Sequence, residues 1–145
     1  MKQGMHVLQK ITLLLLLAIL SLGSSCSSGP QEKSMGEAFK QYETIIRCSQ
    51  WDAAADFISP DYQIDHPITR LEMDRLRLFK VTAYTLRSTG IFDEGRTARQ
   101  VVEIKMFNSY QAVERTIIDE QEWRYDEERE RWLLHSGLPD PTKRE

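Results

Sequence analysis

Histidine and cysteine are scarce in this chain of 145 residues, which contains three histidines and two cysteines. No two ligand-type residues stand at a spacing typical of a metal site, so the sequence predicts no bound metal. It also lacks a glycine-rich phosphate loop, a nucleophile elbow and a Ser-His-Asp pattern. The sequence therefore carries no catalytic signature and predicts no cofactor.

Long apolar runs are also missing, apart from Ile11–Leu22. This run holds 12 residues, whereas a helix that spans a membrane needs about 20. It follows a start that contains Lys2 and Lys10 but no acidic residue, and small residues come after it. This order is typical of a secretory signal peptide over residues 1–25. The alternative, an uncleaved membrane anchor, is disfavoured by the length of the run.

The expected signal peptide ends at Cys26, after Gly23, Ser24 and Ser25. This stretch resembles the lipobox of bacterial lipoproteins, in which the cysteine is lipidated and becomes the first residue of the mature chain. It departs from that pattern at Gly23, where an aliphatic residue is usual. The resemblance implies diacylglycerol and palmitate chains on Cys26, and two or more acyl chains give stable anchoring. Ser27 in the next position implies the outer membrane rather than the inner one.

Only Cys48 remains as a thiol once Cys26 is lipidated, so an internal disulfide is excluded. Cys48 falls in an amphipathic stretch, where we expect a small buried apolar residue rather than a reactive thiol. Lys2 and Lys10 leave with the signal, so 17 Lys and Arg face 22 Asp and Glu, and the mature side chains sum to −5. This acidic balance argues against a nucleic-acid partner, which needs a basic face.

A lipidated cysteine and a polar tether are predicted over residues 26–34, a single domain over 35–139 and a charged tail over 140–145. Residues 27–34, taken as a flexible coil, span about 15 Å. The domain is therefore expected close to the outer membrane and facing the periplasm.

Helical spacing of apolar residues predicts a helix over Gly36–Cys48 and a shorter one over Trp51–Ile58. The segment Asp61–Ile68 has no clear pattern. A capping-box spacing that starts at Thr69 predicts a further short helix near Arg70–Leu76.

The apolar period then changes to two residues, which is typical of strands. The first predicted strand switches parity along its length, which indicates a bulge and a bend. Helices followed by strands predict an α+β domain, with helices on one face of a curved, mainly antiparallel meander sheet of about four strands. The strands are expected within residues 77–92, 99–107, 112–125 and 132–137.

Two stretches resemble the nuclear transport factor two-like superfamily: CSQWDAAADFISPDY at residues 48–62, its helical opening, and EWRYDEERERWLLHSGLP at residues 122–139, its closing hairpin. The resemblance implies a cone, made of a bent sheet wrapped on helices, with a pocket at one end. Its members include isomerases, dehydratases and non-catalytic binding domains, so the fold does not choose an activity. Residues 77–84 and 125–140 also resemble uncharacterised lipoproteins of proteobacteria.

Candidate pocket residues come from the third strand, where Arg115, Asp119 and Gln121 share parity with the apolar Ile117 and would point into the cone. A carboxylate there could have a raised pKa and act as a general acid or base. Two structural alternatives stay open: a bulge near Asp119 that turns these residues outward, or an ion pair between Arg115 and Asp119.

Tyr84 and Tyr125 complete the candidate pocket, where a tyrosine could donate to an oxyanion. Packing of the ring with a solvated hydroxyl explains both residues equally well. His66, next to Asp65, could serve as a base, although it is expected in an exposed loop. His135 is expected on the sheet surface or partly buried.

Two functions follow. The first is a lipid-anchored, non-catalytic binding or assembly module of the cell envelope. Its expected partner is an envelope protein at the membrane, and a homodimer through the open sheet face is the alternative arrangement. The alternative is a small-molecule-binding protein, or an isomerase-like or dehydratase-like enzyme, that uses the cone pocket. A cone filled by Phe39, Trp51, Trp123 and Met106 favours the first function. A roomy pocket that contains Asp119 favours the second. The lack of a catalytic signature favours the first.

Overall fold

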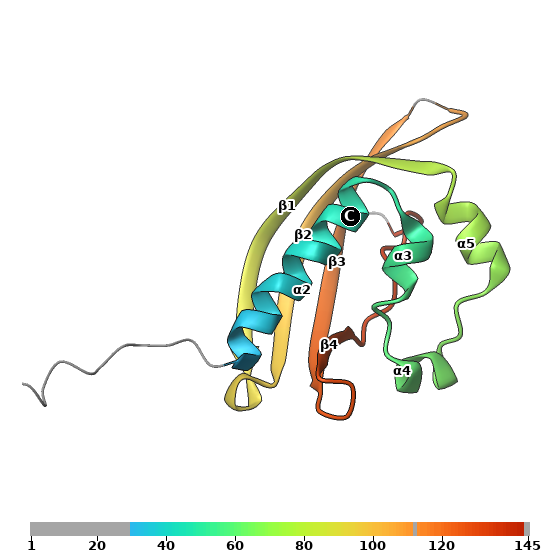
Figure 1. The fold of residues 1–145 in the computed structure, drawn as a ribbon. Coiled ribbons are helices and arrows are strands. Elements are labelled where there is room, and N and C mark those ends of the chain that lie inside the picture. Colours follow the sequence, from blue (N-terminus) through green and yellow to red (C-terminus); the bar gives the residue numbers. More distant parts are fainter. Residues whose placement is uncertain (1–29, 112, 144–145) are drawn as a thin grey trace, which may run out of the picture.

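The computed structural model describes residues 30–111 and 113–143 as an α+β domain (Figure 1). In these residues four helices lead into four antiparallel strands. The sequence predicts three of the helices and the order of helices before strands. The helices are α2 (Pro30–Arg47), α3 (Trp51–Ala55), α4 (Pro60–Asp65) and α5 (Arg70–Leu76). The strands are β1 (Phe79–Phe92), β2 (Thr97–Asn108), β3 (Glu114–Asp126) and β4 (Arg131–Leu134).

The sheet is a simple meander in the order β1-β2-β3-β4, so each strand pairs with its neighbours in the sequence. It is strongly curved, and α2 lies along its concave side (Figure 1). The register between β1 and β2 shifts twice, between Val81 and Ala83 and between Leu86 and Ser88. These shifts confirm the bulge predicted from the parity switch in β1, because an extra residue bends the strand that contains it.

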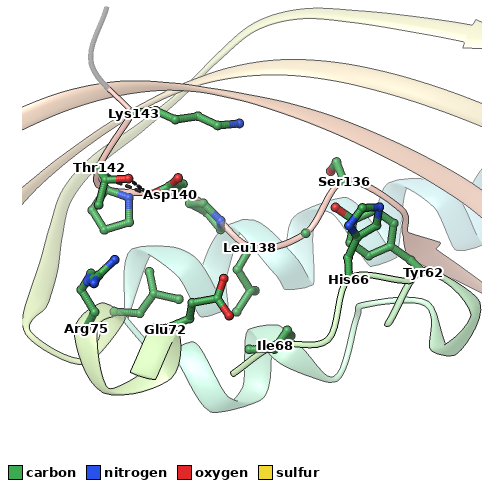
Figure 2. Close-up of a pocket in the computed structure, with 14 residues that line it drawn as sticks. Tyr62, His66, Ile68, Glu72, Arg75, Ser136, Leu138, Asp140, Thr142 and Lys143 are labelled. Atoms are coloured by element: carbon green, nitrogen blue, oxygen red, sulfur yellow. Dashed lines mark hydrogen bonds between the residues drawn. The ribbon is translucent and has the colours of Figure 1, made fainter. Parts of the chain in front are cut away.

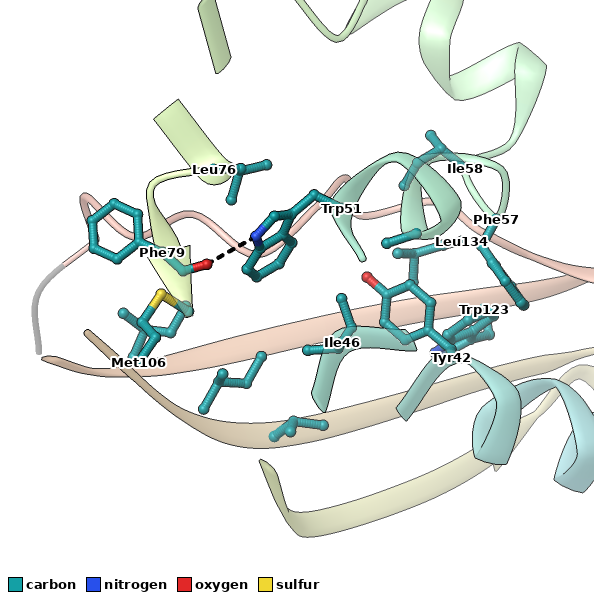
Figure 3. Packing of buried hydrophobic residues seen from close by; sticks show 14 of the residues in the cluster. Tyr42, Ile46, Trp51, Phe57, Ile58, Leu76, Phe79, Met106, Trp123 and Leu134 are labelled. Carbon is teal, nitrogen blue, oxygen red and sulfur yellow. Dashed lines mark hydrogen bonds between the residues drawn. The ribbon is translucent and has the colours of Figure 1, made fainter. Parts of the chain in front are cut away.

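The core fills the space between α2 and the concave face of the sheet (Figure 3). Trp123 lies at its centre, with ring centroids 5.2 Å from Phe39, 5.1 Å from Tyr42 and 6.1 Å from Phe57. These are the tilted or edge-on contacts that aromatic pairs prefer. Helix α2 is thereby fixed to the middle of the sheet.

Two polar contacts hold the helical segment against the start of β1. The indole Nε1 of Trp51 donates to the Phe79 carbonyl at 3.1 Å (Figure 3). The Ser49 hydroxyl accepts from the backbone N–H of Val81 at 2.9 Å. Both join residues about thirty positions apart, so they place the end of α2 at the start of β1.

The helices differ from the predicted ones at their ends. Helix α2 begins at Pro30, so residues 30–34, expected in the tether, are helical. Proline suits the first position of a helix because its missing N–H has no partner there. Helix α3 ends at Ala55 rather than Ile58, and α4 occupies the segment without a clear pattern. The capping box at Thr69 is confirmed: its hydroxyl accepts from the Glu72 N–H, and the Glu72 carboxylate accepts from the Thr69 N–H.

The prediction of a buried Cys48 is wrong, since its side chain is exposed. Helix α2 ends at Arg47, and Cys48 falls in the turn that follows, where the helical spacing no longer sets the direction of its side chain.

Candidate functional site

Gln121 lies at the centre of a polar cluster on the concave face of the sheet and is almost fully buried. Its Nε2 donates to Asp119 Oδ2 at 2.8 Å, and its Oε1 accepts from Trp123 Nε1 at 3.2 Å. The Tyr84 hydroxyl lies 3.2 Å from Nε2 and 3.4 Å from Oε1, so it can accept from one and donate to the other. The amide therefore joins a carboxylate, an indole and a phenol in one network.

Asp119 is the group in this cluster whose pKa comes close to neutral pH. Burial raises the pKa of its carboxyl from 3.8 to about 6, although the hydrogen bond from Gln121 and the charge of Lys143 act in the opposite direction. The desolvation cost of the charged form exceeds both favourable contributions. This carboxyl can take up or release a proton near neutral pH.

Tyr42 and Tyr84 bring two phenols to this part of the core. Burial raises the pKa of both hydroxyls, and the negative charge of Asp119 acts in the same direction. The Tyr42 hydroxyl is fully buried and has no hydrogen-bond partner among the described residues. Such an unsatisfied hydroxyl is uncommon in a folded core.

The structure brings together three of the five candidate pocket residues, Tyr84, Asp119 and Gln121, and places the other two elsewhere. The Arg115 guanidinium lies over the Phe79 ring, 5.7 Å from its centroid, and donates to the Pro141 carbonyl at 3.2 Å. The Tyr125 ring packs edge-on against Trp132, with centroids 5.7 Å apart. The register of β2 and β3 runs without a shift from Glu114 to Arg124, so no bulge turns Asp119 outward.

Core side chains cover much of the concave face of the sheet, with Trp123 beside the cluster and Met106 nearer the start of β1. Trp51, Trp123 and Met106 are buried there (Figure 3). The partly buried Phe39 packs against Trp123, with ring centroids 5.2 Å apart. Packing of these four residues in the core favours the non-catalytic binding module over the pocket enzyme.

A groove of about 360 Å³ lies between the helical segment and the chain that follows β4 (Figure 2). Tyr62 and His66 stack at one side of it, with ring centroids 4.6 Å apart. The other lining residues are Ile68, Glu72, Arg75, Leu76 and residues 136–143.

The charged side chains of the groove carry both signs. The Glu72 carboxylate accepts hydrogen bonds from the Thr69 N–H and hydroxyl, each at 2.7 Å. The Asp140 carboxylate accepts from the Thr142 N–H and hydroxyl at 2.8 and 2.6 Å (Figure 2). Hydrogen bonds lower the pKa of both carboxyls, and the Arg75 charge contributes. The groove is thus a mixed polar surface with no excess of one charge.

The other candidate residues from the sequence lie outside the polar cluster, and His66 lines the edge of the groove. Asp65 and His66 are exposed at the end of α4, and His66 contacts Tyr62 through its ring. His135 follows β4 and is partly buried, and burial lowers the pKa of its imidazole. Cys26 and the expected signal peptide lie outside the described residues.

Sequence reasoning missed Tyr42 and the groove. Tyr42 has the spacing of an ordinary core residue of a helix, and nothing local shows that its hydroxyl faces a carboxylate 77 positions later. The groove joins residues 62–76 to residues 136–143, so only the folded chain reveals it.

No group of three or more His, Cys, Asp and Glu side chains that could hold a metal ion occurs within residues 30–111 and 113–143. None of the helices in the described part of the chain is long and apolar enough to cross a membrane. Comparison of the chain with protein-family models, curated proteins and solved structures finds no match.

Proposed function

We propose that the chain is a lipid-anchored lipoprotein of the bacterial outer membrane, whose domain is a non-catalytic binding or assembly module facing the periplasm. One observation carries the non-catalytic part: the concave face of the sheet is packed with the core residues Phe39, Trp51, Trp123 and Met106. Side chains that fill this face leave the outer surface of the domain for recognition. The order of helices and curved meander sheet agrees with a nuclear transport factor two-like cone, which we propose as its fold family.

The anchor part of the proposal rests on Cys26 and the segment before it. A short apolar run, small residues and a cysteine precede a helix that begins at Pro30. The acyl chains would hold the domain at the bilayer, since each buried CH₂ contributes about 0.8 kcal/mol.

Replacing Cys26 with Ser tests the anchor. We expect Cys26→Ser to fold like the wild type but to leave the membrane fraction, because it keeps the domain and removes the thiol that carries the lipid. Membrane fractionation, with the mass of the N-terminal peptide, measures this outcome. Cys48→Ser is the matched control and should remain at the membrane with its lipid. A Cys26→Ser chain that stays at the membrane, or fails to fold, contradicts the proposal.

The recognition part points to the groove between α4, α5 and residues 136–143. The groove is lined by charges of both signs and by the paired rings of Tyr62 and His66, and α5 beside it exposes Leu71 at 66 %. Together they offer polar, aromatic and apolar contacts to another protein. The proposed partner is therefore an envelope protein, with which the anchored domain assembles.

A photo-crosslinking amino acid at Leu71 tests this surface in cells that make the lipidated chain. We expect one discrete adduct with an envelope protein from position 71, and none from the same amino acid at Leu86. Leu86 is a matched control because it is also apolar and 51 % exposed, but lies in β1. Equal adducts from both positions, or none from position 71, contradict recognition through the groove.

The alternative function, a small-molecule-binding protein or isomerase-like enzyme, is favoured by one observation. The raised pKa of Asp119 and the unpartnered Tyr42 hydroxyl give the concave face a titratable group beside a free donor. A small molecule retained by the purified chain, and lost on Asp119→Asn, would support this function over the binding module.

A further inference from the structure

The first residue of α2 lies close in sequence to the proposed attachment point. Four peptide steps separate Cys26 from Pro30, and an extended chain covers at most about 3.6 Å per residue, so the two lie within about 14 Å. This step rests on the proposed function, because it takes Cys26 as the lipidated residue. The start of α2 is then held at the membrane surface.

The direction of α2 shows which end of the domain this is. Phe39 contacts Trp123, which stands in the same row of the sheet as Ile91, near the end of β1. Ser49, just beyond the other end of α2, bonds to Val81 near the start of β1. The helix therefore begins at the end of the sheet that carries the β1–β2 turn (Figure 1).

The β3–β4 turn lies at the same end. Ser34 of α2 lines a surface hollow together with Glu130 and Arg131. The Arg96 guanidinium, in the β1–β2 turn, lies 3.7 Å from the Glu127 carboxylate in the β3–β4 turn. We call this region the turn end; it comprises the start of α2 and residues 91–97 and 126–131.

The turn end exposes two large apolar side chains, Ile91 and Phe92, at 51 % and 47 %. Ile91 pairs with the buried Ala98 and so lies on the concave face, whereas Phe92 lies on the opposite face. The Arg99 guanidinium lies over the Phe92 ring, 5.3 Å from its centroid. The end of the sheet therefore presents apolar surface on both faces, with a cation beside it.

The charges of the turn end indicate the kind of membrane surface that it fits. Arg96, Arg99 and Arg124 line a shallow hollow together with Asp93 and Glu122, and Glu122 pairs with both Arg99 and Arg124. Neighbouring groups of both charges suit a headgroup that also carries both. The acidic side chains of residues 91–97 and 126–131 outnumber the basic ones, so a purely anionic bilayer would be repelled. The acidic residues are Asp93, Glu94, Asp126, Glu127, Glu128 and Glu130. A zwitterionic headgroup offers a phosphate to the arginines and an ammonium to the carboxylates.

We propose that the turn end is a membrane-contact surface that docks on the zwitterionic headgroups of the bilayer through Ile91 and Phe92. The short link to Cys26 imposes the contact, and the two apolar side chains fix the tilt. In this orientation Cys48 and the β2–β3 hairpin lie away from the membrane.

Thiol-specific labelling of the lipidated full chain tests the orientation, because Cys48 is an exposed native thiol at the distal end of α2. A fluorophore is placed on Cys48, or on Glu94→Cys in a Cys48→Ser background, in vesicles of phosphatidylethanolamine and phosphatidylcholine. A spin-labelled headgroup lipid serves as the quencher. We expect several-fold stronger quenching at position 94 than at position 48. Adding Ile91→Ser and Phe92→Ser should reduce this ratio while the chain stays on the vesicles.

The outcomes separate the inference from the function on which it rests. Equal quenching at positions 94 and 48 in a vesicle-bound chain, or a ratio unchanged by the Ile91 and Phe92 substitutions, overturns the docking surface alone. If mass spectrometry of the chain made in cells finds no acyl groups on Cys26, the lipoprotein proposal and the inference fail together.

Discussion

Replacing Asp119 with Asn is expected to stabilise the domain by up to about 3 kcal/mol at pH 7. Burial raises the pKa of this carboxyl from 3.8 to about 6, and one pKa unit corresponds to about 1.4 kcal/mol. The folded state therefore disfavours the charged form. Asparagine removes the charge, keeps the size of the side chain and keeps an oxygen that can accept from Gln121 Nε2.

The gain should depend on pH in a defined direction. Because the pKa of Asp119 is higher in the folded than in the unfolded chain, the folded state holds the proton more tightly between pH 3.8 and about 6. The destabilising contribution of Asp119 is thus absent below about pH 3.8 and complete above about pH 6. The difference between Asp119→Asn and the wild type should shrink towards zero as the pH falls to 4.

Urea unfolding at pH 7.5 and at pH 4 measures both values. Glu120→Gln is the matched control, because Glu120 is the next residue of β3 and is exposed. Its free energy of unfolding should change by no more than about 0.5 kcal/mol at either pH. Destabilisation by Asp119→Asn at pH 7.5, or a gain that is the same at both pH values, would contradict a raised pKa for Asp119.

The faces of β3 could be predicted from the sequence because its alternation is uninterrupted. Ile117, Gln121 and Trp123 are buried, as their shared parity indicates, and the unbroken register with β2 keeps Asp119 on the same face. Parity cannot show where a long side chain ends. Arg115 shares this parity, yet its guanidinium lies over Phe79.

The short helix α4 and the exposure of Cys48 could not be predicted from apolar spacing. Helix α4 has no buried residue, so it has no apolar stripe to reveal it. Its position depends on tertiary contacts, since the N–H of Ser59, just before it, donates to the Leu134 carbonyl at 2.9 Å. Cys48 continues the helical spacing, but the helix has already ended at Arg47. A distant strand therefore holds α4 in place, whereas α2 ends through a local change of backbone, with Ser49 at a φ of 55°.

The polar cluster around Gln121 could also be predicted from the sequence only in part. The sequence predicts that Tyr84, Asp119 and Gln121 lie on strands, and hydrogen bonds through Gln121 join them in the fold. Tyr42 enters from α2, and its position depends on how the helix crosses the sheet. The Tyr42 hydroxyl comes under the influence of the Asp119 charge only after the aromatic core has fixed that crossing, so the site depends on the packing of the core.

Replacing Trp123 with Ala should therefore destabilise the domain by about 3–5 kcal/mol, the usual cost of removing a large buried aromatic side chain. Trp123 is fully buried and contacts Phe39, Tyr42 and Phe57. Its loss leaves a cavity beneath α2 and removes the N–H that Gln121 Oε1 accepts. Trp123→Phe keeps one ring in place and should lose less, and thermal or urea unfolding measures both.

Tyr110→Ala is the matched control, since Tyr110 is an aromatic residue 83 % exposed beyond the end of β2. Its loss should change the free energy of unfolding by no more than about 0.5 kcal/mol. If Trp123→Ala costs no more than Tyr110→Ala, the concave face is not a filled core, and the observation that carries the binding-module proposal is removed. If Trp123→Ala lowers the free energy of unfolding strongly and Tyr110→Ala does not, core side chains fill the concave face. Recognition is then left to the outer surface of the domain.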